Sequence, residues 1–559
     1  MFKSSMHQVV YQIWPRSFQD SNDDGIGDIN GIIQRLDYLQ DLGIKLIWLS
    51  PIYFSPNHDY GYDIEDYYSI QPEFGTMKDF DLLIKEAKQR GIGLIMDLVA
   101  NHTSDQHAWF QAALKDPNSP YRDYYVFKPS KNGKEPNNWL SLFGGSAWTK
   151  LANEDLYYLT LFTPQQVDLN WQNSAMRQEI YAMMRFWLDK GIAGFRMDVI
   201  NIIAKKEGYP DKNPRKKGYQ FADDLIVSLP LSHDYLKEMY ESVLKDCPGL
   251  FLGEGLLITP EQAKAYSGLQ SHELDMMFHF DTILLGCGPL GKYDFRKLYH
   301  FSIKEYKRVF FKWQMASQNM DFVLGNFLSN HDNGRSVSRF GDDQRYRIES
   351  QKALLLNTLT ARGTPFIYQG EEIGMTNLKL DEKDWKDFEA INDYQMLQSM
   401  MHLPAFLSKK IVQKMTRDQA RTPVQWNDQV NAGFSTHEPW MIVNPNYKTI
   451  NVAQAQSDPN SILNFTKQLI AFHQAHPVFA LGRIEEVLNS HKQIIAYIRS
   501  DENECLLILI NLDHKVAMVK LEEEYRQKTV LCNYLEFQEL EHKMVFRPYE
   551  ARIIQLINK

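Results

Sequence analysis

The sequence is poor in cysteine and contains no long apolar run. Its 559 residues include only four cysteines: Cys247, Cys287, Cys505 and Cys532. Their spacing matches neither a metal-binding cysteine motif nor a disulfide framework, and isolated reduced thiols are typical of cytosolic proteins. No apolar run approaches the ~20 residues of a membrane-spanning helix, and residues 1–7 lack the apolar core of a signal peptide. We therefore predict a cytoplasmic protein with no membrane partner.

The chain also lacks a strong charge of one sign. Its net charge is −9, and the charged residues, 23% of the total, are mixed in sign along it. A nucleic-acid surface needs a concentrated basic patch, so we predict no nucleic-acid partner. Apolar residues make up 44% of the chain, as in globular proteins, and its length exceeds one ordinary hydrophobic core. We expect two or three domains and a monomer.

Short apolar runs alternate with longer amphipathic segments over most of the chain. Eight runs have the length and composition of buried strands: residues 9–14, 46–50, 93–99, 193–199, 250–253, 274–280, 322–329 and 364–368. Segments with helical periodicity lie between them: residues 29–42, 79–90, 174–190 and 234–245. Thr259 followed by Pro260 marks the start of a shorter helix. Eight strands alternating with helices favour an α/β fold of the (β/α)8 TIM barrel type over a doubly wound sheet.

Two insertions interrupt this alternation. Residues 104–173 are rich in Pro, Asn, Trp and Tyr, which predicts an irregular subdomain after the third strand, and residues 375–450 form a second excursion after the eighth. From residue 482 the pattern changes to short alternating strands: residues 493–498, 505–511, 516–521 and 551–556. These strands predict an antiparallel β-sandwich at residues 482–559. The barrel would then comprise residues 1–103 and 174–481.

The most informative stretch is Gly194-Phe195-Arg196-Met197-Asp198-Val199-Ile200-Asn201. Arg196 and Asp198 are two positions apart at the end of an apolar run, so both side chains lie on one side of the expected strand. A neighbouring cation favours the ionised form of a carboxylate, and an ionised, oriented carboxylate is what covalent attack on a sugar carbon requires. Taken alone, a structural ion pair at the end of a strand is the better explanation.

Polar side chains also follow four other predicted strands. They are Asp97, Asn101 and His102 after the third, Glu254 after the fifth, Asn330, His331, Asp332 and Asn333 after the seventh, and Glu371 and Glu372 after the eighth. The carboxyl ends of the strands form one rim of a (β/α)8 barrel, where its chemistry takes place. Packing or helix capping explains each residue alone, but so many buried charges at one rim are unfavourable unless a site uses them. Together they predict an active site.

Four of these stretches resemble, in order and spacing, the signature regions of glycoside hydrolase family 13, the α-amylase superfamily. They are Asp97-Leu98-Val99-Ala100-Asn101-His102, Gly194-Phe195-Arg196-Met197-Asp198, Leu252-Gly253-Glu254 and Ser329-Asn330-His331-Asp332. The run Gln166-Val167-Asp168-Leu169-Asn170 is similar to the fifth region of the oligo-1,6-glucosidase subfamily. The resemblance extends over essentially the whole chain, and it implies an α-glucosidase with a catalytic barrel, an inserted domain and a C-terminal β domain.

The resemblance implies a retaining double displacement. Asp198 corresponds to the nucleophile that forms a covalent glucosyl-enzyme, and Glu254 to the general acid and then the general base. Retention requires the two carboxyl groups roughly 5–5.5 Å apart. Because one group must be ionised and the other protonated, their surroundings must differ, and we expect Arg196 to supply that difference on the Asp198 side.

The same resemblance assigns residues to a glucose pocket. Asp332, the family's third carboxylate, would hold sugar hydroxyls and favour a distorted ring. The substrate-binding residues implied in this way are Asp59, Tyr62, His102, Phe162, Arg196, Val199, His331 and Arg417. An Asp59–Arg417 pair at the closed end of the pocket would keep longer chains from threading through; of the two arginines in residues 417–423, Arg417 is the better match. We therefore expect removal of one glucose at a time from the non-reducing end.

Val199, which follows the nucleophile, bears on linkage specificity. In the resembling subfamily a valine here accompanies a preference for α-1,6 bonds, whereas threonine or alanine accompanies α-1,4 preference. A bulky side chain beside the leaving-group subsite would disfavour the stiffer α-1,4 disaccharide; ordinary strand packing is the alternative explanation. We expect hydrolysis of isomaltose, isomalto-oligosaccharides or dextran ends.

The run Asp20-Ser21-Asn22-Asp23-Asp24-Gly25-Ile26-Gly27-Asp28 resembles the first part of an EF-hand loop. The expected ligands are Asp20, Asn22, Asp24, Ile26 through its carbonyl, and Asp28. Position 12 is Gly31 rather than the usual bidentate glutamate, and a solvated acidic turn is the alternative. The resembling glucosidases carry a structural Ca²⁺ or Mg²⁺ in this loop, so we expect a structural Ca²⁺, with Mg²⁺ as the alternative.

Other functions stay open. Trehalose-6-phosphate hydrolysis is the close rival; it needs a cluster of cations for the phosphate, for which the candidates are Lys205, Lys206, Lys212, Arg215, Lys216 and Lys217. An α-1,4-glucosidase or a sucrose isomerase is a weaker alternative, the latter because residues 290–312 lack a run like Arg-Leu-Asp-Arg-Asp. A non-catalytic transporter subunit would lack the acids. Departures from the subfamily pattern at Val167, Gly255 and Asn333 leave the leaving-group subsite open.

Overall fold

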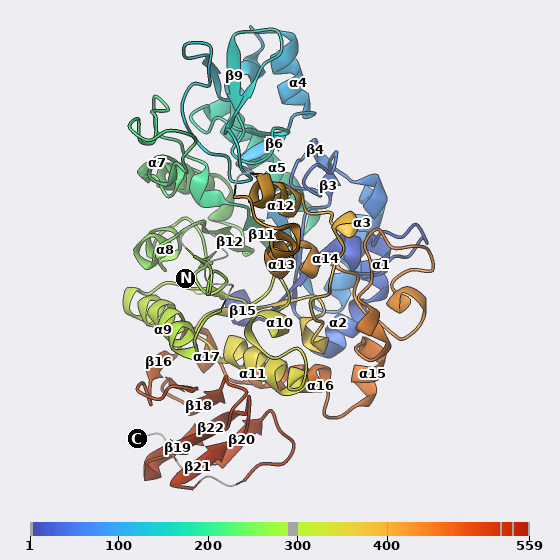
Figure 1. Ribbon diagram of the computed structural model, residues 1–559, viewed down its shortest axis with the longest axis vertical. Coiled ribbons are helices and arrows are strands. Elements are labelled where there is room, and N and C mark those ends of the chain that lie inside the picture. The colour runs from blue at the N-terminus through green and yellow to red at the C-terminus, as the bar shows by residue number, and fades with distance from the viewer. Residues whose placement is uncertain (1–3, 289–299, 400, 526–527, 539–540, 557–559) are drawn as a thin grey trace. The chain divides into compact units, whose positions relative to one another are not determined.

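The computed structural model describes residues 4–288, 300–399, 401–525, 528–538 and 541–556 (Figure 1). Residues 1–3 of the N-terminal segment, and residues 290–299 of the region searched for an isomerase-like run, lie outside the described residues. The cysteines are free thiols without disulfides. Across the described part of the chain, every helix is too short or too polar to cross a membrane.

All eight apolar runs form strands, and these strands belong to one eight-stranded sheet. They are β1 (Val10–Ile13), β2 (Leu46–Leu49), β5 (Gly93–Leu98), β11 (Gly194–Met197), β12 (Leu250–Glu254), β13 (Met276–Phe278), β14 (Gly325–Asn326) and β15 (Thr364–Tyr368). Their order is β13-β12-β11-β5-β2-β1-β15-β14, so strands that follow each other in the chain are neighbours in the sheet, except β13 and β14 at its two ends, and the last strand pairs in parallel with the first. This is the order of a (β/α)8 barrel, as predicted.

Helices follow the strands close to the predicted positions. They include α3 (Met77–Gln89), α5 (Ser174–Lys190), α7 (Pro230–Met239), α8 (Pro260–Ser267), α9 (Ile303–Met320), α10 (Ser336–Phe340), α11 (Arg347–Thr360) and α16 (Ile462–Ala475). Thr259 caps α8 in a full capping box with Gln262. The prediction of one continuous helix at residues 29–42 is wrong, because the segment divides at Arg35 into α1 (Ile29–Gln34) and α2 (Leu36–Leu42).

The described chain forms two compact units, and each is described by itself. The first comprises residues 1–47, 86–92 and 281–559, and the second residues 48–85 and 93–280. In the second unit, β11 pairs in parallel with both β5 and β12. Gly194 begins β11 with φ +143°, and a Cβ there would lie 1.9 Å from the carbonyl oxygen of Leu250. Glycine is therefore required for β11 and β12 to approach each other.

The insertion of the second unit is more regular than predicted. Strand β6 (His102–Ser104) pairs antiparallel with β10 (Gln166–Asp168), and a three-stranded sheet has the order β7 (Phe127–Pro129), β9 (Leu156–Leu159), β8 (Trp148–Lys150). Helix α4 (Ala108–Lys115) lies beside this sheet in Figure 1. A cluster of buried apolar residues that includes Trp139, Trp148 and Leu161 also contains Val199. The inserted segment and the turn after β11 thus share one core.

In the first unit, the excursion after β15 contains helices and the tail contains strands. The excursion contains α12 (Phe388–Ser399), α13 (Ala405–Met415) and α14 (Asp418–Arg421), and α15 (Val452–Ser457) and α17 (Val478–Leu481) follow it. The tail has a five-stranded sheet of β16 (Arg483–Glu486), β17 (Ile494–Ser500), β18 (Cys505–Asn511), β22 (Ala551–Leu556) and β20 (Lys528–Cys532), and a ribbon of β19 (Ala517–Lys520) and β21 (Lys543–Phe546), drawn in red in Figure 1. An apolar core joins the sheet to the ribbon, as expected for a β-sandwich.

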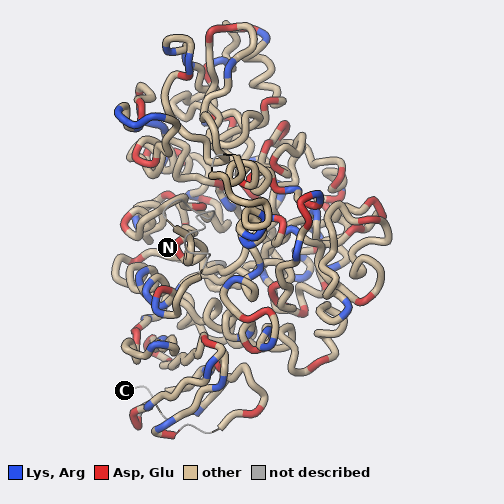
Figure 2. The backbone as a smooth tube through the Cα atoms, in the orientation of Figure 1, with Lys and Arg blue, Asp and Glu red and all other residues tan. Residues whose placement is uncertain are grey.

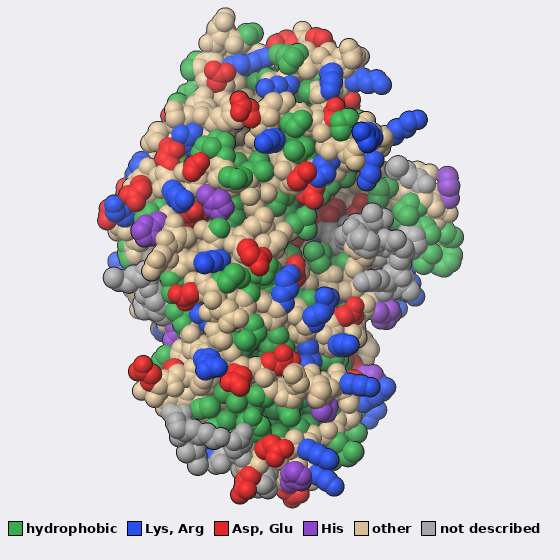
Figure 3. Space-filling view, turned by 90° about the vertical axis from the view of Figure 1, so that its left-hand side faces the viewer, with side chains coloured by type: hydrophobic (Ala, Val, Ile, Leu, Met, Phe, Trp, Pro, Cys, Tyr) green, Lys and Arg blue, Asp and Glu red, His purple; other side chains and the backbone are tan. Residues whose placement is uncertain are grey.

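Charged side chains of both signs are scattered over the surface. On the face drawn in Figure 3, the blue side chains of Lys and Arg lie among the red ones of Asp and Glu. This agrees with the mixed charge of the sequence.

Candidate active site

Arg196 is the centre of a buried charge cluster in the second unit. Its Nη1 lies 2.7 Å from Asp97 Oδ1 and 2.7 Å from Asp198 Oδ1, and its Nη2 lies 2.6 Å from Glu254 Oε2. The three carboxylates come from β5, from the residue after β11 and from the end of β12. Burial opposes the charge of Arg196, but the carboxylates outweigh burial and hold the pKa of Arg196 well above its usual value.

The carboxylates of this cluster differ in their exposure. The side chain of Asp97 is fully buried, whereas those of Asp198 and Glu254 each keep 10% of their surface exposed. Burial raises the pKa of Asp97 to about 6, against the lowering effect of Arg196. Asp97 also accepts hydrogen bonds from Trp48 Nε1 at 3.0 Å and from the Tyr62 hydroxyl at 3.2 Å. Asp97 therefore fixes the cluster, and the other two carboxylates remain open to a ligand.

One expectation for Arg196 is not met. We expected its charge to act on the Asp198 side, but the guanidinium contacts Glu254 as closely as Asp198. Glu254 Oε2 also accepts a hydrogen bond from the backbone N–H of Val199 at 3.0 Å. Parallel pairing of β11 with β12 brings these groups within reach of one cation, and a sequence pattern does not reveal which of two neighbouring carboxylates a guanidinium will prefer.

Four predicted substrate-binding residues lie close together beside this cluster. His102 Nε2 lies 3.0 Å from the carbonyl oxygen of Tyr62, and the ring of Phe162 is 5.0 Å from that of His102. Gln166, which sequence analysis included only in a motif, donates from Nε2 to Asp59 Oδ2 at 3.2 Å. Burial lowers the pKa of His102. These contacts bring an aspartate, a histidine and two aromatic rings close together.

Lys205 does not belong to a solvated basic cluster. Its side chain is 3% exposed, and Nζ lies 2.7 Å from Asp168 Oδ1 and 2.7 Å from Asn101 Oδ1. Lys212 forms ion pairs with Asp223 and Asp224. Along the second unit in Figure 2, blue basic positions are interrupted by red acidic ones. Two of the six cations considered for a phosphate are thus already paired with carboxylates.

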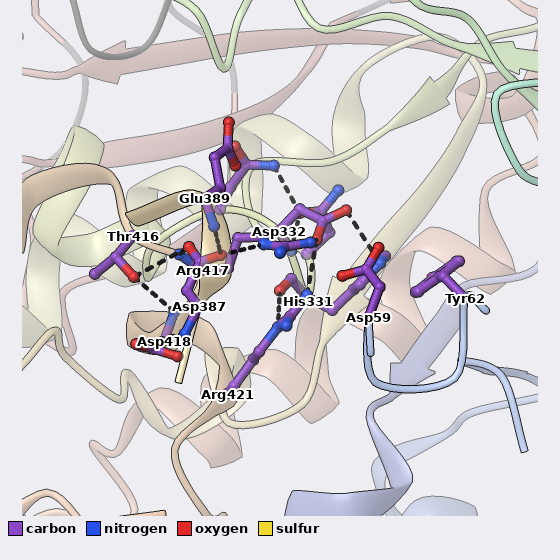
Figure 4. Close-up of polar contacts among 12 residues, drawn as sticks. Asp59, Tyr62, His331, Asp332, Asp387, Glu389, Thr416, Arg417, Asp418 and Arg421 are labelled. Carbon is purple, nitrogen blue, oxygen red and sulfur yellow. Dashed lines mark hydrogen bonds and ion pairs between the residues drawn. The ribbon is translucent and has the colours of Figure 1, made fainter. Parts of the chain in front are cut away.

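Asp332 is the centre of a second charge cluster, which lies in the first unit (Figure 4). Its Oδ2 lies 3.1 Å from His331 Nε2, and its Oδ1 lies 3.1 Å from Arg421 Nη2 and 3.8 Å from Arg417 Nη1. Burial opposes ionisation, but His331 and the two arginines outweigh it and hold the pKa of Asp332 well below its usual value. Both arginines of residues 417–423 contact Asp332, although only Arg417 was predicted.

Neighbouring side chains hold this second cluster in place. His331 Nδ1 lies 2.8 Å from Gln12 Nε2, and its ring stacks on Trp14 at 5.3 Å. Asp387 is fully buried and accepts from Arg417 Nε at 2.8 Å and from the Arg417 backbone N–H at 2.9 Å. Asp387 was not predicted, because it lies in the second excursion and outside the motifs that the resemblance covers. Glu372, also considered a site candidate, accepts from Tyr11 and Tyr38 hydroxyls and is a buried structural group.

The predicted metal loop forms a compact turn. Asp20 Oδ1 accepts from the backbone N–H groups of Asn22 and Asp23, and Asp28 caps α1 by accepting from Gly31 N at 2.7 Å. Gly25 has φ +85°, which only glycine adopts without strain. Oxygen ligands on a glycine turn fit a hard cation. Among the described residues, however, no group of three or more His, Cys, Asp or Glu side chains is arranged so that it could hold a metal ion.

Comparisons with known proteins agree with this geometry. A family model described as "Alpha amylase, catalytic domain" matches residues 12–482. The chain is 45% identical over 555 residues to an oligo-1,6-glucosidase of Parageobacillus thermoglucosidasius, covering 98% of each chain. It is 43% identical over 551 residues to a glucan 1,6-alpha-glucosidase of Streptococcus pneumoniae, again covering 98% of each. The crystal structure of Bacillus licheniformis trehalose-6-phosphate hydrolase superposes with a TM-score of 0.93 at 39% identity, covering 100% of both chains.

Proposed function

The chain belongs to the α-amylase family of glycoside hydrolases, and from that premise we propose that it is an exo-acting, retaining α-glucosidase. Its substrates are the α-1,6-glucosidic bonds at the non-reducing ends of isomaltose, isomalto-oligosaccharides or dextran. One observation carries the proposal: in a chain similar over its full length to 1,6-glucosidases, Arg196 holds two carboxylates, Asp198 and Glu254, that both remain partly exposed.

In this mechanism Asp198 attacks the anomeric carbon. A bond forms between its carboxylate oxygen and C1, the glycosidic C–O bond breaks, and Glu254 gives a proton to the departing oxygen. Glu254 then takes a proton from water, which attacks C1 and releases Asp198 and α-glucose. Arg196 favours the ionised form of Asp198 because its Nη1 lies 2.7 Å from Oδ1. Two inversions at C1 leave the configuration unchanged.

The remaining predicted residues bind the terminal glucose in this proposal. Asp59, Tyr62, His102 and Phe162 supply polar groups and an aromatic surface from the second unit. The pKa of Asp332 lies well below its usual value, so Asp332 is an ionised acceptor for sugar hydroxyls. We assign His331 and Arg417 to the same hydroxyls, on the strength of the family motif and of their contacts with Asp332.

Trehalose-6-phosphate is the second candidate substrate, because one relative of known structure is named a trehalose-6-phosphate hydrolase. A phosphate requires unpaired cations. Lys205 is buried against Asp168, and Lys212 is paired with two aspartates, so neither supplies that charge. The other four candidates, Lys206, Arg215, Lys216 and Lys217, are exposed, so trehalose-6-phosphate stays the second candidate and is not excluded. Maltose and sucrose are weaker candidates.

The proposal is tested by the rate of glucose release from isomaltose, isomaltotriose, dextran, maltose, sucrose and trehalose-6-phosphate, measured side by side. We expect the highest kcat/KM among the α-1,6-linked substrates. Proton NMR of the first turnovers should show α-glucose as the initial product. A higher kcat/KM for trehalose-6-phosphate than for every α-1,6 substrate would replace the first candidate by the second, and initial β-glucose would exclude retention.

We further propose a Ca²⁺ ion, with Mg²⁺ as the alternative, in the loop of Asp20, Asn22, Asp24, Ile26 and Asp28. The ion would neutralise the carboxylates of a turn that Gly25 permits, and its role would be structural. We also propose a cytoplasmic monomer, in keeping with its four free thiols. Subcellular fractionation and sedimentation analysis test location and oligomeric state.

A further inference from the structure

The residue after the proposed nucleophile has a strained backbone. Val199 has φ +36° and ψ +37°, in the left-handed region. A β-branched residue rarely adopts this conformation, which costs on the order of 1–3 kcal/mol. Val199 is nevertheless 9% exposed and packs in one apolar cluster with Ile202 and Leu161. Strain of this kind persists only where the surrounding structure imposes it, so neighbouring contacts must hold Val199 in this conformation.

The strained turn directs one backbone N–H toward a catalytic carboxylate. The N–H of Asp198 still donates to the carbonyl oxygen of Leu98 at 3.0 Å, as in a strand. The next N–H, that of Val199, instead donates to Glu254 Oε2 at 3.0 Å. The carbonyl oxygen of Val199 then accepts from Ile202 N at 3.0 Å. The chain therefore leaves β11 immediately after Asp198 and contacts the side chain of Glu254 as it turns.

A buried asparagine on the same turn contacts the backbone beyond Glu254. Asn201 is fully buried; its Nδ2 donates to the carbonyl oxygen of Leu256 at 2.8 Å, and its Oδ1 accepts from Leu256 N at 3.0 Å. Its Nδ2 also donates to the Ser228 hydroxyl at 3.0 Å, and Ser228 N donates to the Asn201 carbonyl oxygen at 2.7 Å. Only a primary amide offers a donor and an acceptor in this geometry.

Gly255, which joins Glu254 to Leu256, has little conformational freedom. Gly255 N donates to the carbonyl oxygen of Phe278 at 3.2 Å. A Cβ at position 255 would lie 2.8 Å from Ile258 and 2.9 Å from the Phe278 oxygen, so the backbone there is tightly packed. A residue that fixes Leu256 therefore also fixes Glu254, two positions earlier.

We propose that Asn201 is a positioning residue for Glu254. We call its hydrogen bonds to Leu256 and Ser228, with the Val199 N–H bond to Glu254, the Asn201 brace. The brace ties the loop after the acid/base to the turn after the nucleophile and so sets the place of one carboxyl group relative to the other. This inference rests on the proposed function, in which Glu254 is the acid/base.

Loss of the Asn201 brace should impair proton donation by Glu254 to the leaving group and should leave substrate binding intact. A leaving sugar oxygen needs a proton from Glu254, whereas 4-nitrophenolate departs with little help. Misplacing Glu254 should therefore slow isomaltose hydrolysis far more than hydrolysis of 4-nitrophenyl α-glucoside. Because displacements near 1 Å can reduce a rate by about 100-fold, we expect kcat for isomaltose to fall about 10- to 100-fold, with KM little changed.

The test compares Asn201→Asp and Asn201→Ala with Asn533→Asp and Asn533→Ala. Asn533 is a matched control: it is 2% exposed, its Nδ2 donates to the carbonyl oxygens of Tyr549 and Glu349, and its Oδ1 accepts from Ala551 N, all in the first unit. Both pairs should lower Tm. Only the Asn201 variants should lower the ratio of isomaltose to 4-nitrophenyl α-glucoside kcat; equal loss on both substrates, or the same ratio as in the Asn533 variants, would overturn the proposal.

If the Asn201 variants are insoluble, Ser228→Ala, which removes only one bond of the brace, replaces them; a smaller shift of the ratio in the same direction supports the proposal, and an unchanged ratio overturns it. If the wild type releases no glucose from isomaltose, the proposed function fails. The same ratio, measured on whichever α-glucoside the wild type hydrolyses, still decides whether Asn201 positions Glu254.

Discussion

The guanidinium of Arg196 contacts Glu254 at 2.6 Å, as closely as it contacts Asp198 at 2.7 Å. One cation therefore serves both carboxylates of the proposed double displacement, and it does not by itself separate an acid from a nucleophile. Glu254 also accepts a hydrogen bond from the Val199 N–H, and such a donor, like the arginine, favours the ionised form of a carboxylate. The assignment of acid and nucleophile therefore rests on the family motif, and not on Arg196 or on the turn after β11.

Replacement of Asp198 by asparagine tests the nucleophile. The amide cannot form the glycosyl-enzyme, so kcat should fall by on the order of 10⁴-fold or more. Arg196 keeps Asp97 and Glu254 as partners, so the protein should stay folded, with a Tm within a few degrees of the wild type. Isomaltose turnover and thermal unfolding are the measurements. Turnover near the wild-type rate would exclude Asp198 as the nucleophile.

Val199→Thr tests the linkage preference. The side chains are nearly equal in size, but threonine adds a hydroxyl beside the proposed leaving-group subsite, and the resemblance connects threonine here with α-1,4 bonds. We expect the maltose to isomaltose ratio of kcat/KM to rise, by about tenfold. Ile202→Val, in the same buried cluster, is the control for altered packing and should leave the ratio unchanged. A wild type that prefers maltose would contradict the role of Val199 before any variant is made.

Lys205→Met tests whether this lysine is structural. The substitution leaves Asp168 without its cation in a fully buried place, which should lower the free energy of unfolding by about 3–5 kcal/mol. The double variant Lys205→Met/Asp168→Asn removes the unpaired charge and should recover part of the loss. Urea unfolding measures both. A variant of normal stability that has selectively lost trehalose-6-phosphate turnover would instead assign Lys205 to a phosphate.

Removal of divalent cations tests the metal loop. A bound ion stabilises the folded state by mass action, so protein dialysed against EDTA should have a lower Tm, restored by Ca²⁺ more than by Mg²⁺. Asp24→Asn should weaken this response, whereas Asp189→Asn, at an exposed helical position, should not. A Tm that no divalent cation changes would remove the ion from the proposal and leave a hydrogen-bonded acidic turn.

The strands were predictable because each is a short apolar run, and local pattern is enough to identify such runs. The break at Arg35 was not predictable, because its cause is distant in sequence. Arg35 donates to Gln19 Oε1 at 2.8 Å and lies 4.0 Å over the ring of Trp426. These contacts outweigh a continuous helical periodicity, since tertiary packing overrides local propensity.

Some residues of the candidate site were likewise predictable from the sequence, and others were not. Asp198, Glu254 and Asp332 were found because motifs carry them, and their roles stay predictions. Lys205 was grouped with other candidate cations for a phosphate because its partner Asp168 is far from it in sequence, and composition does not reveal which lysine is buried. Asn201 was part of the most informative stretch, yet its function depends on Leu256, which only the fold brings near.

Burial of His107 makes the stability of the protein depend on pH in the acid range. This residue is 5% exposed and caps α4, its Nδ1 accepting from Trp109 N at 3.2 Å. Burial lowers the pKa of His107 to about 4, with Asp66 acting in the opposite direction. The unfolded chain has a histidine pKa near 6.5, so between about pH 4 and 6.5 it binds more protons than the folded state. The stability that His107 contributes is complete above about pH 6.5 and decreases as the pH falls toward 4.

His107→Asn separates this titration from the helix cap, because asparagine is a good capping residue but does not titrate. The wild type should lose about 3 kcal/mol from this residue between pH 6.5 and 4, and the variant should lose correspondingly less. Urea midpoints at pH 4, 5, 6 and 7 measure the difference, with His514→Asn, at a side chain that is 62% exposed, as the control. If both variants keep the wild-type slope, protonation of His107 does not drive the acid loss, and other buried groups such as His473, with a pKa of about 4, must account for it.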